Sequence, residues 1–542
     1  MGPPSSEWGG GPTGFPPPAM AFLTRGAGIG ARPAHDFLGD AGERAGAPHG
    51  RPRNVTSELG VTAQAPPPTT GPPDAGRAPA PGGPASGCAD AGPDAPVPER
   101  GGPGFWQAVR PLLLRLHFYA GVCVGPFLLV AAVTGLAYTT TPQLEQVLYR
   151  HELTVSPVPG SRPVAEQVRA AARAVPHGTL QSVEPAATPT ASTRVAFGVP
   201  GLPDGYSTTA FVDPHTGKVL GTLRTYGDWL PVRAWLDSLH RTLHLGEFGR
   251  NYSELAASWL WVEVLGGLVL WIGSPRRARR LRRTLLPRPG AGRGRTASWH
   301  GALGLWVAAG LLGLSATGLT WSLHAGTSIG KIQDALHGST PSVATALPHR
   351  APSPGAPGAR DAGLDGALAA AHRAGLSGPL VVTPPGGPGV AYEVKENKRS
   401  WPEAQDSVAV DPVTGRVTAH LRFADYPVLA KLTRWGIDAH MGLLFGLANQ
   451  IALALLALGL IAMVLLGYRM WWRRRPTRGE GRRLPRPPAR GAWRRLPGRV
   501  LAPAAVALCV LGYYLPLFGI PLAVFLVADA AVGAVRRRRA AL

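Results

Sequence analysis

The chain has 542 residues, and its 55 lysines and arginines against 32 aspartates and glutamates give it a formal net charge of +23. The arginines gather beside long apolar runs, which is the positive-inside pattern of an integral membrane protein. The composition therefore indicates a lipid bilayer as a partner and disfavours nucleic acid, for which the sequence holds no recognition motif.

The apolar runs and basic clusters predict an α-helical integral membrane protein with four core spans, a C-terminal hairpin and two extracytoplasmic α+β domains. In chain order the predicted segments are a disordered cytoplasmic arm (1–104), span 1 (105–138), a first outer domain (139–253), span 2 (254–273), a basic cytoplasmic loop (274–298), span 3 (299–322), a second outer domain (323–442), span 4 (443–468), a basic cytoplasmic linker (469–499), a C-terminal membrane hairpin (500–535) and a basic tail (536–542).

The N-terminal arm is rich in Gly, Pro and Ala with little apolar periodicity, so it is predicted to be disordered. It carries no signal-peptide pattern. Arg110 and Arg115 stand just before the first apolar run. By the positive-inside rule, they place the N-terminus in the cytoplasm of a multi-pass plasma-membrane protein.

Each outer segment is predicted to contain a helix followed by short strands and a tight turn. The turns read DPHTG at 213–217 and DPVTG at 411–415. In each turn Asp accepts backbone N–H groups, Pro presets φ and Gly takes the positive-φ position, so each predicts a hairpin. The matching order of elements indicates an internal duplication, with two parallel repeats related by an axis along the membrane normal.

Two acidic residues fall within predicted spans, where an unpaired charge is costly. Glu263 lies in span 2 and is expected to face the protein interior, either as a proton or ligand contact or as a partner for a neighbouring helix. Asp529 lies in the C-terminal run and is expected to face protein. Arginines at both ends of that run favour a hairpin with two cytoplasmic ends, which makes six predicted spans.

His117 and His300 stand at the cytoplasmic ends of spans 1 and 3. Small residues follow each of them at four-residue steps, and both spans close on Thr-Gly-Leu seventeen residues after the histidine. A single helix of this kind is most simply read as close helix packing. Because the pattern occurs twice, it favours a flat porphyrin beside each stripe, with imidazole as the axial ligand to iron.

Three further histidines precede the outer ends of spans 2 and 4. His240 and His244 are one helical turn apart before span 2, and His440 stands before span 4. The local motifs pair His244-Leu245-Gly246 with His440-Met441-Gly442 and leave His240 opposite Gly436. The predicted ligand set therefore has two levels across the membrane.

The simplest symmetric scheme places one haem iron between His117 and His300 and a second between His244 and His440. A mixed scheme, in which a ligand of span 1 pairs with His240 or with His324, stays open if helices kink.

The paired DPxTGxV hairpins, the LHxG and AHMGLLFG segments and the WHxxxG…TGLxW span resemble the PepSY-associated transmembrane proteins over roughly residues 105–475. That group includes iron-regulated inner-membrane proteins and ferric-siderophore reductases with two b-type haems. The resemblance implies PepSY-like outer domains and electron transfer through haem to a ferric siderophore or another extracytoplasmic iron chelate. It implies His117, His244, His300 and His440 as ligands.

No dinucleotide-binding G-x-G-x-x-G motif follows a strand and opens a helix, so a cytoplasmic or membrane electron donor is expected. Two other functions stay open. One is a transporter of iron chelates whose repeats rock about a central site. The other is a non-enzymatic membrane anchor whose outer domains bind or inhibit a protease, which leaves the membrane histidines unexplained.

Overall fold

The computed structural model describes residues 105–273, 285–287, 289–347, 362–473, 491, 494 and 496–541. The predicted arm, and parts of the basic segments predicted at 274–298 and 469–499, lie outside the described residues.

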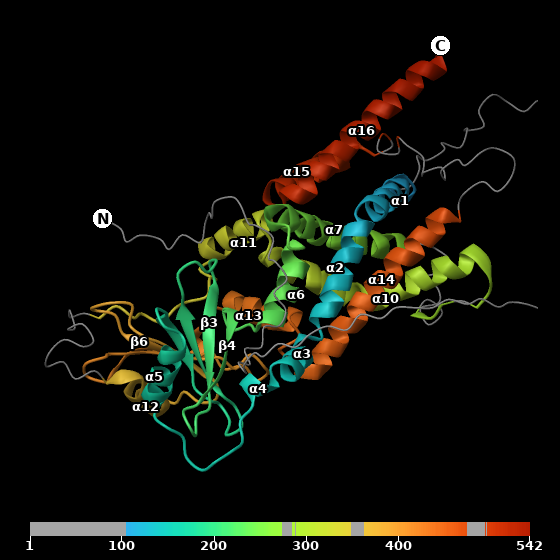
Figure 1. Ribbon diagram of the computed structural model, residues 1–542. Coiled ribbons are helices and arrows are strands. Elements are labelled where there is room, and N and C mark those ends of the chain that lie inside the picture. Colours follow the sequence, from blue (N-terminus) through green and yellow to red (C-terminus); the bar gives the residue numbers. More distant parts are fainter. Residues whose placement is uncertain are drawn as a thin grey trace, which may run out of the picture. The chain divides into compact units, whose positions relative to one another are not determined.

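Among the described residues, four helices are long and apolar enough to cross a membrane. They are α7 (Gly246–Ile272), α10 (Gly292–Thr320), α14 (Gly446–Trp472) and α16 (Pro516–Ala541). A fifth span is counted when α1 (Phe105–Cys123) and α2 (Gly125–Tyr138), which are bent by 58°, are taken as one broken helix (Figure 1). The first half of the predicted C-terminal hairpin corresponds to α15 (Gly498–Tyr514). Its 17 residues make it a shorter apolar helix, which is not counted among the spans.

The bend between α1 and α2 has a local cause in Pro126. Proline lacks the N–H that would bond to the carbonyl of Val122, four residues earlier, and this opens the helix. The hydroxyl of Tyr468 on α14 donates to that carbonyl at 2.8 Å. A Cβ on Gly125 would approach the same hydroxyl to 2.9 Å, so a larger residue there would displace it. The neighbouring helix thus satisfies the backbone group that the break exposes.

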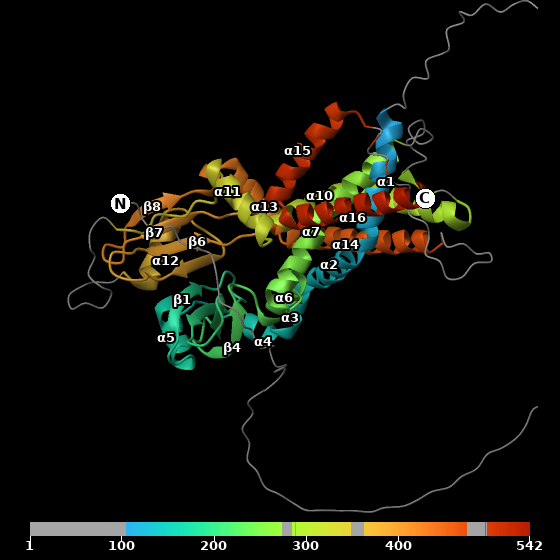
Figure 2. The ribbon, with the colours of Figure 1, turned by 90° about the horizontal axis from the view of Figure 1, so that it is seen from above.

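The C-terminal pair α15 and α16 packs on the core through the start of α16 (Figure 2). Phe518 is 2% exposed, and its ring centroid lies 5.4 Å from those of both Trp259 and Trp261 on α7. Farther along α16, Asp529 forms an ion pair with Arg115 of α1. The expectation that Asp529 faces protein is confirmed.

The outer segments form one antiparallel sheet of eight strands in the order β4-β3-β2-β1-β5-β6-β7-β8. The strands are β1 (Thr179–Glu184), β2 (Thr193–Gly198), β3 (Tyr206–Val212), β4 (Val219–Tyr226), β5 (Leu380–Thr383), β6 (Tyr392–Glu396), β7 (Ser407–Val410) and β8 (Val417–Leu421). The pairing of Val183 with Val382 joins β1 to β5. The two predicted domains therefore share one sheet.

Both predicted hairpin turns are confirmed. The Asp213 carboxylate accepts the N–H of His215 at 2.9 Å, and the Asp411 carboxylate accepts the N–H of Val413 at 2.8 Å. Gly217 and Gly415 close the turns at φ values of 75° and 63°, a region that favours glycine.

One face of the sheet is covered by α5 (Val164–Ala174) and α12 (Gly363–Arg373). Their alanines and the inward valines of both halves of the sheet form one apolar core. Asp365 of α12 also caps α5, because its carboxylate oxygens accept the N–H groups of Val164 and Ala165 at 2.7 and 3.0 Å. The core and the cap tie the two outer segments together.

The remaining helices connect the sheet to the spans. They are α3 (Thr141–Leu148), α4 (Arg150–Leu153), α6 (Pro231–Thr242), α11 (His324–Ala335) and α13 (Val428–His440).

We expect Asp365→Ala to destabilise the outer sheet by about 1 kcal/mol, because two N–H groups at the start of α5 lose their acceptor. Thermal unfolding of the detergent-solubilised protein, with hydrogen exchange of α5 amides, measures the effect. Asp204→Ala, at an exposed position, is the matched control. Equal melting temperatures and equal exchange in the two variants would contradict the capping role.

Candidate functional site

Two cavities lie among the spanning helices. The outer one has a volume of about 370 Å³ and is lined by α2, α7, α10 and α14 together with the short helices α6 and α13. His240 of α6 and His440 of α13 both face it. The inner one has a volume of about 340 Å³, and His117 of α1 and His300 of α10 face it.

Each outer histidine is held by the threonine of a Thr-Gly-Leu segment. Nδ1 of His240 lies 2.9 Å from Oγ1 of Thr134, and Nδ1 of His440 lies 2.6 Å from Oγ1 of Thr317. Both hydroxyls already donate to a carbonyl four residues earlier in their own helix, at 2.9 and 2.8 Å. Each threonine oxygen therefore accepts from the imidazole Nδ1–H, which leaves Nε2 with a free lone pair.

Burial also keeps these two rings neutral. It lowers the pKa of His240 to about 4 and the pKa of His440 to about 3. A neutral imidazole with its proton fixed on Nδ1 is the form in which histidine ligates a metal through Nε2.

The inner pair has a carboxylate in the position that threonine takes in the outer pair. Nδ1 of His117 lies 2.9 Å from Oε2 of Glu263 on α7. The ring centroids of His117 and His300 are 6.3 Å apart, with an angle of 68° between the ring planes. Glu263 faces the protein interior, as expected, and contacts the histidine of a neighbouring helix.

A glycine lies beside each of the four rings, so close that a Cβ added to it would be within 4 Å of the imidazole. The glycines are Gly135 beside His240, Gly267 beside His117, Gly318 beside His440 and Gly467 beside His300. Two of them belong to the Thr-Gly-Leu segments. The inner cavity is also lined by small residues that follow His117 and His300 in the sequence, namely Gly121, Gly125 and Gly304.

The two cavities are neighbours. Four leucines line both of them, namely Leu128, Leu260, Leu311 and Leu460. These four side chains come from four different helices, and they are the only described residues that line both cavities.

The structure does not bring His244 into the outer cavity. His244 follows α6 in a left-handed conformation with φ of 55°, and its ring packs 4.9 Å from that of Trp235. His324 starts α11, and its Nε2 lies 3.0 Å from the side-chain oxygen of Asn251. Of the two candidates before span 2, the structure thus places His240, and not His244, in the outer cavity with His440.

The matching positions of His240 and His440 had a signal in the sequence. His240 and His440 each stand five residues after a tryptophan and six residues before the glycine that begins the next span. Those glycines, Gly246 and Gly446, have nearly equal φ values of 57° and 55°. The shorter His-x-Gly match drew attention to His244 because it ignored these longer spacings.

The arrangement fits a planar metal macrocycle better than a bare metal ion. Among the described residues, no group of three or more His, Cys, Asp or Glu side chains could hold a metal ion. A protein zinc site takes three or four protein ligands, whereas haem iron needs at most two, on opposite faces of the ring. Each cavity offers two histidines and a largely apolar wall. The residues present therefore fit haem.

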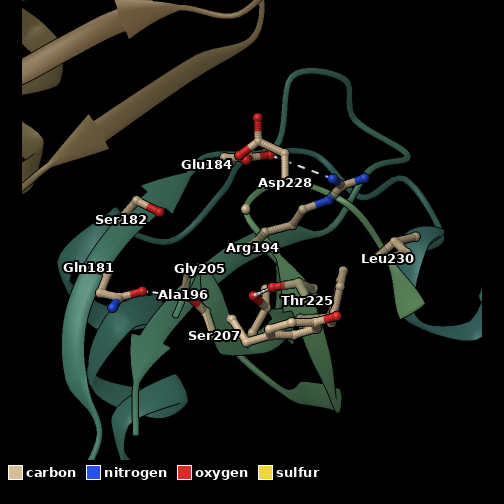
Figure 3. A pocket seen from close by; sticks show the side chains of 14 residues that line it. Gln181, Ser182, Glu184, Arg194, Ala196, Gly205, Ser207, Thr225, Asp228 and Leu230 are labelled. Atoms are coloured by element: carbon tan, nitrogen blue, oxygen red, sulfur yellow. Dashed lines mark hydrogen bonds and ion pairs between the residues drawn. The ribbon is translucent and has the colours of Figure 1, made fainter. Parts of the chain in front are cut away.

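A third pocket, of about 210 Å³, lies on the outer sheet (Figure 3). Glu184 and Asp228 lie side by side in it, and Nη1 of Arg194 is 3.6 Å from Oε2 of Glu184. Asp228 also accepts the side-chain N–H of Asn397, which follows β6, at 3.2 Å. Burial and the carboxylate of Asp228 together raise the pKa of Glu184 to about 7. The hydrogen bond from Asn397 to Asp228 links this pocket to the other half of the sheet.

The raised pKa of Glu184 predicts a pH-dependent outer sheet. Glutamate in an unfolded chain has a pKa of about 4.3, so the folded protein binds the extra proton between about pH 4 and pH 7. This stabilisation is complete below the unfolded pKa and is lost as pH rises through the folded pKa. We expect amide exchange of β1 and β2 to accelerate from about pH 5 to about pH 8, beyond its intrinsic pH dependence.

Glu184→Gln should flatten that profile, whereas Glu247→Gln, at an exposed position, should leave it unchanged. A wild-type profile that Glu184→Gln does not alter would show that another group is responsible.

Comparison with known proteins gives one family. The sequence model of the PepSY-associated TM region matches residues 114–474, which include all four cavity histidines. No match is found among the curated proteins.

Proposed function

Because the chain belongs to the family of the PepSY-associated TM region, a multi-pass membrane family, we propose that it is a haem-containing transmembrane electron-transfer protein. In this proposal the chain would hold two b-type haems, and electrons would pass from a cytoplasmic or membrane donor to a ferric siderophore or another iron chelate on the outer face of the cytoplasmic membrane. The N-terminus is cytoplasmic.

The observation that supports the proposal most is the pairing of four histidines in two adjacent cavities. His117 and His300 share the inner cavity, and His240 and His440 share the outer one. Haem, when bound, would supply a one-electron iron couple, and these four histidines are the residues that would hold it. The chain's own part would be to present the four imidazoles, with Nε2 of His240 and His440 unprotonated, and to separate the two levels with the shared leucine layer.

The groups behind the imidazoles differ between the two levels. Glu263 stands behind His117, whereas threonine hydroxyls stand behind His240 and His440. A carboxylate partner makes an imidazole a stronger donor to iron than a hydroxyl does. The inner level is therefore expected to have the lower reduction potential, so electrons would move downhill from the inner to the outer level.

The bend in α1–α2 is the one observation that favours the transporter alternative, since broken helices are frequent at transport sites. Uptake of an iron chelate into vesicles without any redox partner would support it. The third alternative, an outer module that binds a protease, gives no role to the paired histidines.

The ligand set predicts the outcome of single substitutions. Wild-type protein reconstituted with haem should bind two haems and show a b-type reduced-minus-oxidised spectrum. His240→Ala and His440→Ala should each lose the outer haem and retain the inner one. His244→Ala is the matched control and should keep both, because its ring lies against Trp235 outside the cavity.

A colourless wild-type protein that is folded and supplied with haem would refute the proposal. Loss of haem in His244→Ala but not in His240→Ala would refute the ligand assignment alone.

A further inference from the structure

The outer cavity contains a cation without a counterion. Three arginines line the cavity: Arg241, Arg250 and Arg399. Nη1 of Arg241 is 3.1 Å from Asp237, and Nη2 of Arg399 is 2.6 Å from Asp438. The side chain of Arg250 has no hydrogen bond or ion pair to any residue in the part of the chain that the structure describes.

The other carboxylate of the cavity wall does not balance Arg250. Glu254 is 1% exposed, and its two oxygens accept the N–H groups of His324 and Ala325, each at 2.9 Å. Those bonds cap the start of α11 and use the carboxylate fully. Arg250 is half-buried at the cavity wall, so its guanidinium is available to an anionic group on whatever the cavity binds.

The place of Arg250 on α7 fixes which end of the cavity carries this charge. Arg250, Glu254 and Ala257 follow one another along the same helix face at four- and three-residue steps. Ala257 is level with His440, because a Cβ on Gly318 would lie 3.8 Å from both. Seven residues of helix span about 10.5 Å, so Arg250 lies toward the outer end of α7, beyond the level of His440.

The inner cavity differs in this respect. None of the described residues that line it is a lysine or an arginine. Glu263 is the one acidic residue among them, and it contacts His117. The excess positive charge is therefore a property of the outer cavity and of its outer end.

We propose that Arg250 binds a propionate carboxylate of the outer haem, so that this haem is bound with its carboxylate edge toward the outer face. The inference rests on the proposed function, since it assigns a partner to the same cofactor. The planar guanidinium can pair with a carboxylate through two parallel hydrogen bonds, and such a bond to a charged group is among the stronger ones in proteins. The pairing would set the rotation of the macrocycle about the axis between His240 and His440.

The test compares haem with haem dimethyl ester, in which both propionates are uncharged, using full-length apoprotein in detergent. Titration followed by absorbance gives the affinity at each of the two sites. We expect Arg250→Leu to weaken haem binding at one site by about tenfold or more. We expect the ester to bind to wild type as weakly as haem binds to Arg250→Leu. The ester should lose no further affinity in Arg250→Leu, because each change removes the same ion pair. Arg250→Lys should fall between.

Arg169→Leu, at an exposed position on α5, is the matched control and should bind haem as wild type does. Size-exclusion profiles and an unchanged affinity at the second site establish that Arg250→Leu is folded, and Arg250→Lys carries the test if it is not.

Three results would overturn the inference. The first is an unchanged haem affinity in Arg250→Leu, and the second is a loss of affinity in Arg250→Leu with the ester that equals the sum of the two separate losses. The third is a change only in the half-saturating concentration of a ferric chelate. The last would assign Arg250 to the substrate. A wild-type protein that binds neither haem nor its ester would instead refute the proposed function.

Discussion

The hydrogen bond between a span threonine and an outer imidazole is the interaction on which the rest of the site depends. It occurs twice, with Nδ1–H of His240 donating to Thr134 and Nδ1–H of His440 donating to Thr317. Each bond joins a spanning helix to the short helix that leads down from the outer sheet. Because the hydroxyl proton is already engaged within its own helix, the bond also fixes which ring nitrogen carries hydrogen. One contact thus positions the ring and sets its chemistry.

The outer sheet serves this arrangement by holding the two short helices in place. The sheet is continuous from β4 to β8, and a shared core and the Asp365 cap join its halves. Helices α6 and α13 each follow the last strand of one half. The separation of their histidines therefore depends on how the two halves of the sheet join, which they do at the pairing of Val183 with Val382.

Much of this architecture follows from local sequence signals. Apolar length predicts the spans, and the Asp-Pro-x-Thr-Gly turns predict two hairpins whose geometry the structure reproduces. His117, His300 and His440 face the cavities, as the motif positions suggest. The matching order of elements agrees with the predicted internal duplication, which stays an interpretation.

What the sequence could not supply are the contacts between distant segments. The choice between His240 and His244 depends on where α6 ends, because the helix stops at Thr242 and the left-handed backbone after it places His244 against Trp235 rather than in the cavity. The joining of two domains into one sheet and the position of Arg250 likewise depend on packing between residues far apart in the chain. Local motifs carry no information on such distances.

The leucine layer between the cavities has a consequence for the energetics of the membrane. In the proposed function, electrons alone would pass from one level to the other, past the four leucines that line both cavities. Outward movement of one electron then transfers a full negative charge without compensation. With a cytoplasm that is electrically negative, the resting voltage would favour this transfer by about 2.3 kcal/mol for each 100 mV. Each turnover would discharge the membrane slightly, which couples iron acquisition to the energy state of the cell.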